Sequence, residues 1–106
     1  MEKLNLDKND ISCIPSSFSQ LTSLYSLSIQ QNKLTHFPTQ ICSLPNLKYL
    51  DLSYNSLGRV SSKISRITSL QVLKLASSRL YDLPDKFLSL SNLDTLDLKS
   101  NRLTSL

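Results

Sequence analysis

Apolar residues recur along this chain with a period of 23 residues. Successive segments begin at Met1, Leu24, Leu47, Leu70 and Leu93, and each has the form L-x-x-L-x-L-x-x-N-x-L. Numbered from that first residue, positions 1, 4, 6, 11, 14, 18 and 21 of every unit hold Leu, Ile, Val, Phe or Met. A fixed period of this length indicates stacked units that cannot bury their apolar faces alone. The units are 1–23, 24–46, 47–69, 70–92 and a partial 93–106.

Each unit is predicted to contain one short strand and a longer return. Positions 4 and 6 are apolar with a polar residue between them, which is the alternation of a half-buried strand. Strands joined by long returns align in parallel, so we expect one sheet with a strand from every unit. Asparagine at position 9 can satisfy backbone groups where the chain turns; these residues are Asn9, Asn32, Asn55 and Asn101. Proline at position 15 and apolar residues three apart suit a 3-10 or irregular return rather than an α-helix.

With the consensus L-x-x-L-x-L-x-x-N-x-L-x-x-Φ-P-x-x-Φ-x-x-L-x-x (Φ apolar), the chain resembles the leucine-rich repeat family. The resemblance implies an α/β solenoid of horseshoe shape, with one short parallel strand per repeat and 3-10 or irregular convex returns. The 23-residue class resembled here is found in intracellular signalling scaffolds, including adenylate-cyclase and Ras-binding relatives. Similar arrays occur in bacterial proteins, including effectors delivered into host cells. Residues 1–106 then form one leucine-rich repeat domain.

Three features depart from the consensus. Ser78 replaces asparagine in the fourth unit, where we expect a bound water to help satisfy the turn. In the third unit Ser61 replaces proline and Gly58 follows the last leucine of the motif, which predicts a looser return. Polar capping sequences are missing, because Met1 and Leu106 already occupy apolar positions. We therefore predict either a fragment of a longer array or end-to-end self-association.

The composition excludes several classes of partner. The net charge is +4, from 12 basic and 8 acidic residues, and no run of five like charges predicts a nucleic-acid-binding arm. No stretch of 18 apolar residues predicts membrane insertion. Cys13 and Cys42 lie on different segments of the return, and none of the seven asparagines begins an N-x-S/T sequon. These features favour a reducing compartment, and we predict a cytoplasmic, intracellular location.

Polar positions 2, 3, 5, 7 and 8 should face outward from the sheet, and the family resemblance implies that this concave face binds partners. We expect a protein partner to contact Tyr25, Ser28, Tyr49, Asp51, Tyr54, Val72, Lys74 and Asp97. Tyr49, Tyr54 and Val72 form the apolar cluster of this face, and tyrosine is enriched at binding hot spots. The alternative is that surface tyrosines simply suit strands and bind nothing.

Two sets of charges also allow more than one interpretation. Asp51, Lys74 and Asp97 alternate in sign at position 5, so they either pair along the stack or steer a partner of mixed charge. Position 10 carries Lys33, Arg79 and Arg102, partly offset by Asp10. This basic edge is either solvated surface or a contact for phosphate or an acidic partner.

Catalysis has one candidate constellation, the stacked residues of position 13. They are Cys13, His36, Arg59 and Asp82. A thiol beside an imidazole can be an activated nucleophile. However, the column lies on a turn, no donor pair for an oxyanion is evident, and Gly58 is the single glycine, which excludes a phosphate-binding glycine loop. Cys13, Cys42 and His36 lack the spacing of metal ligands.

We therefore predict a non-catalytic protein–protein interaction module without cofactor or metal, with a scaffold or adaptor role and a protein partner on its concave face. The alternative is a structural or assembly segment of a longer repeat protein, a host-directed bacterial effector among the candidates.

Overall fold

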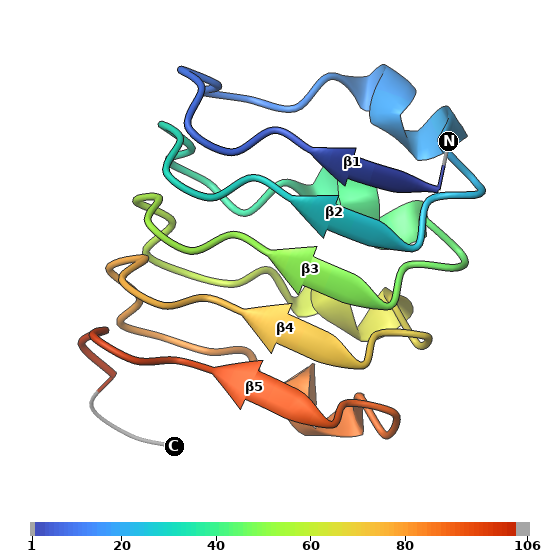
Figure 1. Ribbon diagram of the computed structural model, residues 1–106. Helices are drawn as coiled ribbons and strands as arrows, with labels where there is room; N and C mark the ends of the chain where they lie inside the picture. The colour runs from blue at the N-terminus through green and yellow to red at the C-terminus, as the bar shows by residue number, and fades with distance from the viewer. Residues whose placement is uncertain (1, 104–106) are drawn as a thin grey trace.

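The alternating positions at the start of each unit form a strand, as predicted. The computed structural model describes residues 2–103, apart from the side chains of residues 86 and 88. The strands are β1 (Lys3–Asn5), β2 (Ser26–Ser28), β3 (Tyr49–Asp51), β4 (Val72–Lys74) and β5 (Thr95–Asp97). They form one five-stranded parallel sheet in the order β1-β2-β3-β4-β5 (Figure 1). The register pairs equal positions of successive units, such as Leu27 with Leu50 and Leu50 with Leu73.

The returns contain 3-10 helices, which confirms the prediction from proline and three-residue spacing. These are η1 (Ser16–Gln20), η2 (Thr39–Ser43), η3 (Ser62–Arg66) and η4 (Asp85–Ser89). Proline stands immediately before η1, η2 and η4. The prediction of a looser third return is wrong at η3, because Ser61 adopts φ −64° and its hydroxyl accepts a hydrogen bond from the Lys63 N–H at 3.1 Å. Serine therefore caps this helix where the other units use proline.

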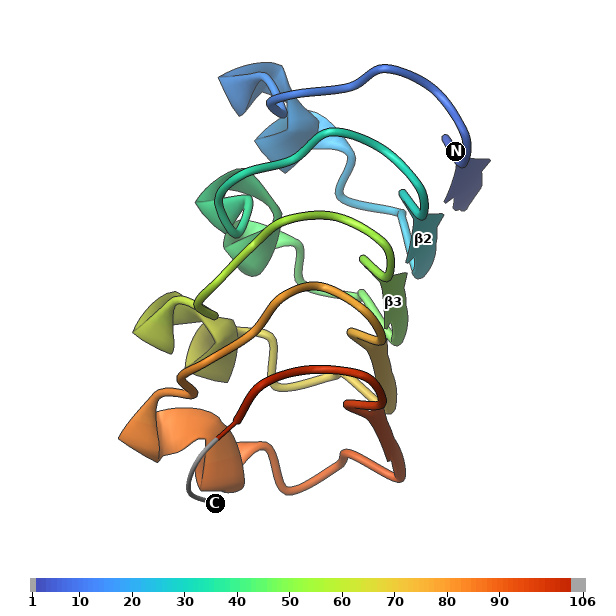
Figure 2. The same cartoon turned by 90° about the vertical axis from the view of Figure 1, so that its left-hand side faces the viewer.

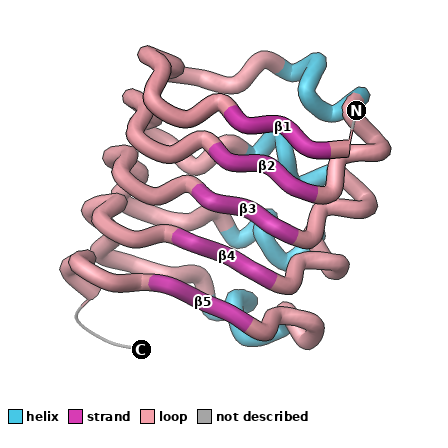
Figure 3. Tube along the Cα trace, viewed as in Figure 1, coloured by secondary structure: helices cyan, strands magenta, loops and turns pink. Residues whose placement is uncertain are grey.

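The coils stack into a shallow arc with the sheet on its inner side. Figure 2 shows the strands along one side and the 3-10 helices along the other, fanned over a wider arc. Figure 3 shows that loops make up most of each coil and join a strand to the helix behind it. The sheet therefore lines the concave side and the helices the convex side, as the family resemblance implied.

The interior is a continuous strip of leucine-rich layers between the sheet and the helices. Leu27, Leu50 and Leu73, one above the other in the sheet, are each 0% exposed. Toward the ends this burial falls: Leu4 is half-buried and Leu96 is 40% exposed. Met1 and Leu106, which the sequence also places in apolar columns, lie outside the described residues.

The asparagine column satisfies the backbone of the turns, as expected. The amide nitrogen of Asn55 donates to the carbonyls of Ile29 (2.9 Å) and Leu52 (3.0 Å), while its oxygen accepts from the Leu34 N–H (3.1 Å). Asn32 and Asn101 make the same type of bridge between neighbouring coils. This column therefore joins each coil to the one before it.

Ser78 needs no water to take the place of asparagine. Its hydroxyl oxygen lies 3.2 Å from the Leu52 carbonyl oxygen and 3.3 Å from that of Ala76, so it reaches acceptors in both coils directly. The missing amide oxygen is replaced by backbone, because the Leu57 N–H donates to the Ser78 carbonyl at 3.0 Å. These direct hydrogen bonds satisfy the turn without the bridging water that the sequence suggested.

Candidate functional site

The eight predicted contact residues lie on strands β2–β5 or beside them, on the concave face. This name is used here for the surface formed by positions 2, 3, 5, 7 and 8 of the units. Tyr54 is 52% exposed. Tyr25, Tyr49, Val72, Lys74 and Asp97 are of intermediate exposure. These six side chains are open to a partner.

Ser28 and Asp51 differ from the prediction, because both are buried. Asp51 is 3% exposed, and its carboxylate accepts a hydrogen bond from the Ser53 N–H at 3.0 Å. Ser28 is 9% exposed, and its hydroxyl donates to Oδ1 of Asp7 at 2.6 Å. Asp51 accepts within its own coil and Ser28 donates to Asp7 of the preceding coil, so both residues support the concave face rather than present a surface for contact.

These hydrogen bonds belong to an alternating arrangement that the sequence reasoning missed. In odd-numbered units an Asn or Asp at position 5 accepts from the position 7 N–H of its own unit. The donor and acceptor pairs are Asp7 with Asn5, Ser53 with Asp51, and Lys99 with Asp97. Even-numbered units lack that acceptor, and the position 7 side chain of the preceding unit supplies it. Thus Asp7 accepts from the Gln30 N–H (2.7 Å), and Ser53 accepts from the Ala76 N–H (3.0 Å).

This arrangement explains the alternating charges at position 5 without ion pairing. Asp51 and Asp97 flank Lys74 in the register of the sheet. Nevertheless, the ion pairs found among residues 2–103 are Lys33–Asp10 and Arg59–Asp82. The acidic residues at position 5 thus serve backbone N–H groups, and Lys74 remains available on the concave face.

Two of the tyrosines on this face lie beneath ammonium groups. Nζ of Lys74 is 5.7 Å from the centre of the Tyr49 ring, and Nζ of Lys3 is 5.8 Å from that of Tyr25. Cation–π contacts of this kind are worth about 0.5–1 kcal/mol at exposed sites. Tyr49 also lines a shallow hollow of about 370 Å³ over β1–β3, together with Lys3, Asn5 and Gln30 among others. The sequence reasoning did not select these last three residues, although their positions in the concave columns could have indicated them.

Tyr54 lies at a backbone position with positive φ. Position 8 is left-handed in every unit, with φ between 50° and 60° at Lys8, Gln31, Tyr54, Ser77 and Ser100. A bulky residue rarely adopts this conformation, which costs roughly 1–2 kcal/mol for an L-residue. Tyrosine is therefore not the residue that would stabilise this backbone position best.

The position 13 column does not form a nucleophile–base pair. Cys13, His36, Arg59 and Asp82 are all exposed. Among the described residues no hydrogen bond joins the Cys13 thiol to His36, whose Nδ1 lies 3.1 Å from the Thr35 hydroxyl. The other cysteine, Cys42, is buried on η2, and desolvation raises the pKa of its thiol to about 11. Burial of this kind makes a thiol less reactive.

Residues 2–103 contain no group of three or more His, Cys, Asp or Glu side chains placed to hold a metal ion. Within the same range, no helix has the length and apolarity needed to cross a membrane.

The fold and the repeat identify the family. Residues 22–76 and 1–21 match leucine rich repeat families, and the chain therefore belongs to the leucine-rich repeat proteins. This is generally a non-enzymatic fold for protein–protein interaction. No curated protein matches the chain.

Solved structures of leucine-rich repeat arrays are similar to the whole chain. A Leptospira interrogans leucine-rich repeat protein is 37% identical with a TM-score of 0.95, over 100% of this chain and 27% of its own. A chain of the BIR3–SERK2 complex from Arabidopsis thaliana is 36% identical with a TM-score of 0.84, over 96% and 57%. Internalin C2 from Listeria monocytogenes is 28% identical with a TM-score of 0.87, over 98% and 44%. The chain thus spans about a quarter of the first of these proteins.

Proposed function

We propose that this chain is a non-catalytic scaffold or adaptor module that holds a protein partner on its concave face. The observation that carries the proposal is Tyr54, an aromatic side chain that is 52% exposed although its φ is +60°. The left-handed φ is shared by position 8 of every unit, so the distinctive feature of Tyr54 is its large, exposed aromatic side chain at that position, a residue type enriched at binding hot spots. The family's general use as an interaction fold agrees with this assignment.

The surroundings of Tyr54 support the same face. Tyr49 pairs in register with Val72, which provides apolar area on two adjacent strands. Lys74 lies over Tyr49 and makes no ion pair within the described residues, so its charge can meet a partner. The hydrogen-bonded ladder holds these side chains in place before the partner arrives, which lowers the entropy lost on binding. We expect the partner to cover units two to four.

The test combines Tyr49→Ala with Tyr54→Asn. Proteins captured by the wild-type chain are identified, purified and titrated against each variant by calorimetry. We expect Kd to rise at least tenfold for the double variant, because truncation of hot-spot residues typically costs about 2 kcal/mol or more. Because asparagine tolerates positive φ, the Tyr54→Asn change alone should raise the free energy of unfolding by about 0.5–1 kcal/mol.

Gln20→Ala is the control. Gln20 is an exposed residue at the end of η1 on the convex side, so it does not lie on the concave face. Its removal should leave the affinity within about twofold. Unchanged affinity in the folded Tyr49→Ala/Tyr54→Asn variant would exclude the concave face as the binding site.

We further propose a reducing, cytoplasmic environment. Its support is that Cys13 and Cys42 form no disulfide, one being exposed and the other buried. Export of the tagged protein from cells, measured by fractionation, would contradict this placement.

The second candidate function is assembly into a longer repeat structure. It is favoured by Leu96, which is 40% exposed on β5 while the equivalent leucines of β2–β4 are fully buried. Sedimentation velocity over a range of protein concentrations distinguishes the two functions. A sedimentation coefficient that increases with protein concentration, and does so equally in the Tyr49→Ala/Tyr54→Asn variant, favours assembly. A monomer at every concentration favours the interaction module.

A further inference from the structure

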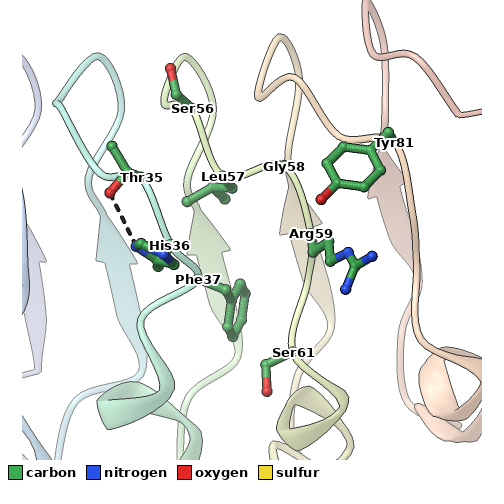
Figure 4. Close-up of a pocket in the computed structure, with 9 residues that line it drawn as sticks. All are labelled: Thr35, His36, Phe37, Ser56, Leu57, Gly58, Arg59, Ser61 and Tyr81. Carbon is green, nitrogen blue, oxygen red and sulfur yellow. Dashed lines mark hydrogen bonds between the residues drawn. The ribbon is translucent and has the colours of Figure 1, made fainter.

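The third coil opens a second hollow on the return side of the solenoid, away from the concave face. It has a volume of about 450 Å³ and is lined by parts of units two, three and four, including Thr35, His36, Phe37, Gly58, Arg59 and Tyr81 (Figure 4). We call it the outer hollow. Its size is within the range of sites that bind ligands in proteins.

Gly58 is the reason that the hollow exists in this coil. Position 12 carries a side chain in the neighbouring units, Thr35 and Tyr81, but none in the third. At φ +72° the residue adopts a conformation that side chains rarely accept, and a Cβ there would lie 3.1 Å from Cε2 of Tyr81. The chain thus uses glycine to bring the Tyr81 ring down beside the third coil, where the Tyr81 N–H also donates to the Gly58 carbonyl (2.9 Å).

The lining of the outer hollow includes a basic residue, Arg59, and no acidic residue. None of the nine residues drawn in Figure 4 is a carboxylate. Arg59 has its guanidinium carbon 5.4 Å from the centre of the Tyr81 ring, which orients the group while leaving its donors open. Its ion pair with Asp82 is long, at 3.9 Å, and both side chains are more than 60% exposed, so that pair contributes little.

His36 adds a second donor on another coil. The Thr35 hydroxyl lies 3.1 Å from Nδ1 of His36. When that hydroxyl donates, the neutral imidazole carries its proton on Nε2, which can then donate to a ligand. Figure 4 shows His36 and Arg59 on different coils, with the Arg59 guanidinium directed toward Tyr81. The two donors thus come from neighbouring coils, and an extended chain with several carboxylates can reach both of them.

We propose that the outer hollow is a second binding site, which takes an extended acidic segment of a protein partner. Carboxylates of the segment bind Arg59 and His36, and the exposed Tyr81 ring provides the apolar part of the contact. Arginine suits this role because its planar fork can bind a carboxylate with two hydrogen bonds. The site is independent of the concave face and of the partner proposed there.

The test uses hexaglutamate as the acidic probe and hexaglutamine as its uncharged counterpart. Binding is followed by chemical-shift changes of backbone amides in the ¹⁵N-labelled chain. We expect hexaglutamate to shift the amides of residues 35–37, 56–61 and 81, and hexaglutamine to leave them unchanged. Arg59→Gln and His36→Ala, both changes of exposed side chains, should each weaken binding by about fivefold to tenfold.

Arg102→Gln is the matched control, since it removes the same charge from an exposed arginine of the fifth unit. It should change the affinity by less than about twofold. Equal weakening by Arg102→Gln, or shifts centred on the concave face, would overturn the proposal by showing attraction to net charge alone. Equally tight binding of inorganic phosphate or oligothymidylate in the hollow would also overturn it, because the site would then select charge and not an acidic peptide.

Discussion

At the scale of single residues, side chains provide hydrogen-bond acceptors for backbone N–H groups at position 7, which bond to side chains and not to the neighbouring strand. A buried N–H without an acceptor costs about 1–3 kcal/mol. At position 7 this cost is avoided in two ways, by an acidic or amide side chain two residues earlier or by a side chain from the coil before. Where position 5 is Ser28 or Lys74, the side chain of Asp7 or Ser53 in the preceding unit supplies the acceptor instead.

Asp51→Ala should destabilise the chain by about 1–3 kcal/mol, because the buried Ser53 N–H loses its acceptor. Asp51→Asn keeps an oxygen at the same place and should restore most of that loss. Urea unfolding followed by circular dichroism measures both variants. If alanine and asparagine were equally destabilising, the negative charge and not the hydrogen bond would be the stabilising feature.

At the scale of the element, the asparagine column supplies the hydrogen bonds of the turns, where the backbone forms neither strand nor helix. Asn55 is 4% exposed and bonds to the carbonyls of Ile29, Leu52 and Ser53 and to the Leu34 N–H. One side chain thus joins two coils at the point where neither has a strand or helix.

Asn55→Ala should therefore cost at least about 3 kcal/mol, since several buried backbone groups lose their partner together. Asn55→Ser should be clearly milder, because Ser78 shows that a hydroxyl at this position reaches the equivalent carbonyls. Thermal and urea unfolding of the two variants compare them directly. A serine variant as unstable as the alanine variant would mean that the amide oxygen, which serine lacks, is the essential acceptor.

The helix η2 provides a prediction about pH, through the buried thiol of Cys42. Its pKa is raised from 9.0 to about 11, first by desolvation, with Arg66 and Lys63 opposing the shift. The folded state then keeps its proton when the unfolded state loses it, so the associated stability is present below pH 9 and lost as pH rises toward 11. The difference in unfolding free energy between the wild type and Cys42→Ala should fall by up to about 3 kcal/mol over that window. A difference that stays constant through the same titration would show that the thiol is not desolvated.

The elements were predictable from the sequence because the leucine period reports directly on which side chains meet the core. Strand, return and asparagine turn follow from position alone, and Ser61 keeps η3 because its hydroxyl caps the helix. The site was less predictable. Burial of Ser28 and Asp51 depends on hydrogen bonds to particular neighbours, and the left-handed φ of Tyr54 carries no glycine or asparagine signal. Such features become visible only when the register between coils is known.

At the scale of the whole molecule, stability comes from contacts between neighbouring coils, and no coil has a core of its own. Each inner coil is covered on two sides, whereas a terminal coil of the described chain is covered on one. The equivalent leucines of the sheet show this gradient, from 0% exposure at Leu50 to 40% at Leu96.

This gradient predicts how truncation depends on position along the stack. Leu50→Ala should cost about 3–5 kcal/mol, because it leaves a cavity in a layer covered on both sides. Leu96→Ala removes the same atoms from a side chain that is already 40% exposed, so its cost should stay below about 2 kcal/mol. Equilibrium unfolding of both variants at low and high protein concentration measures the costs. An equally large cost at Leu96 that grows with concentration would show a second copy covering β5, because only an intermolecular contact makes the burial of that leucine depend on mass action.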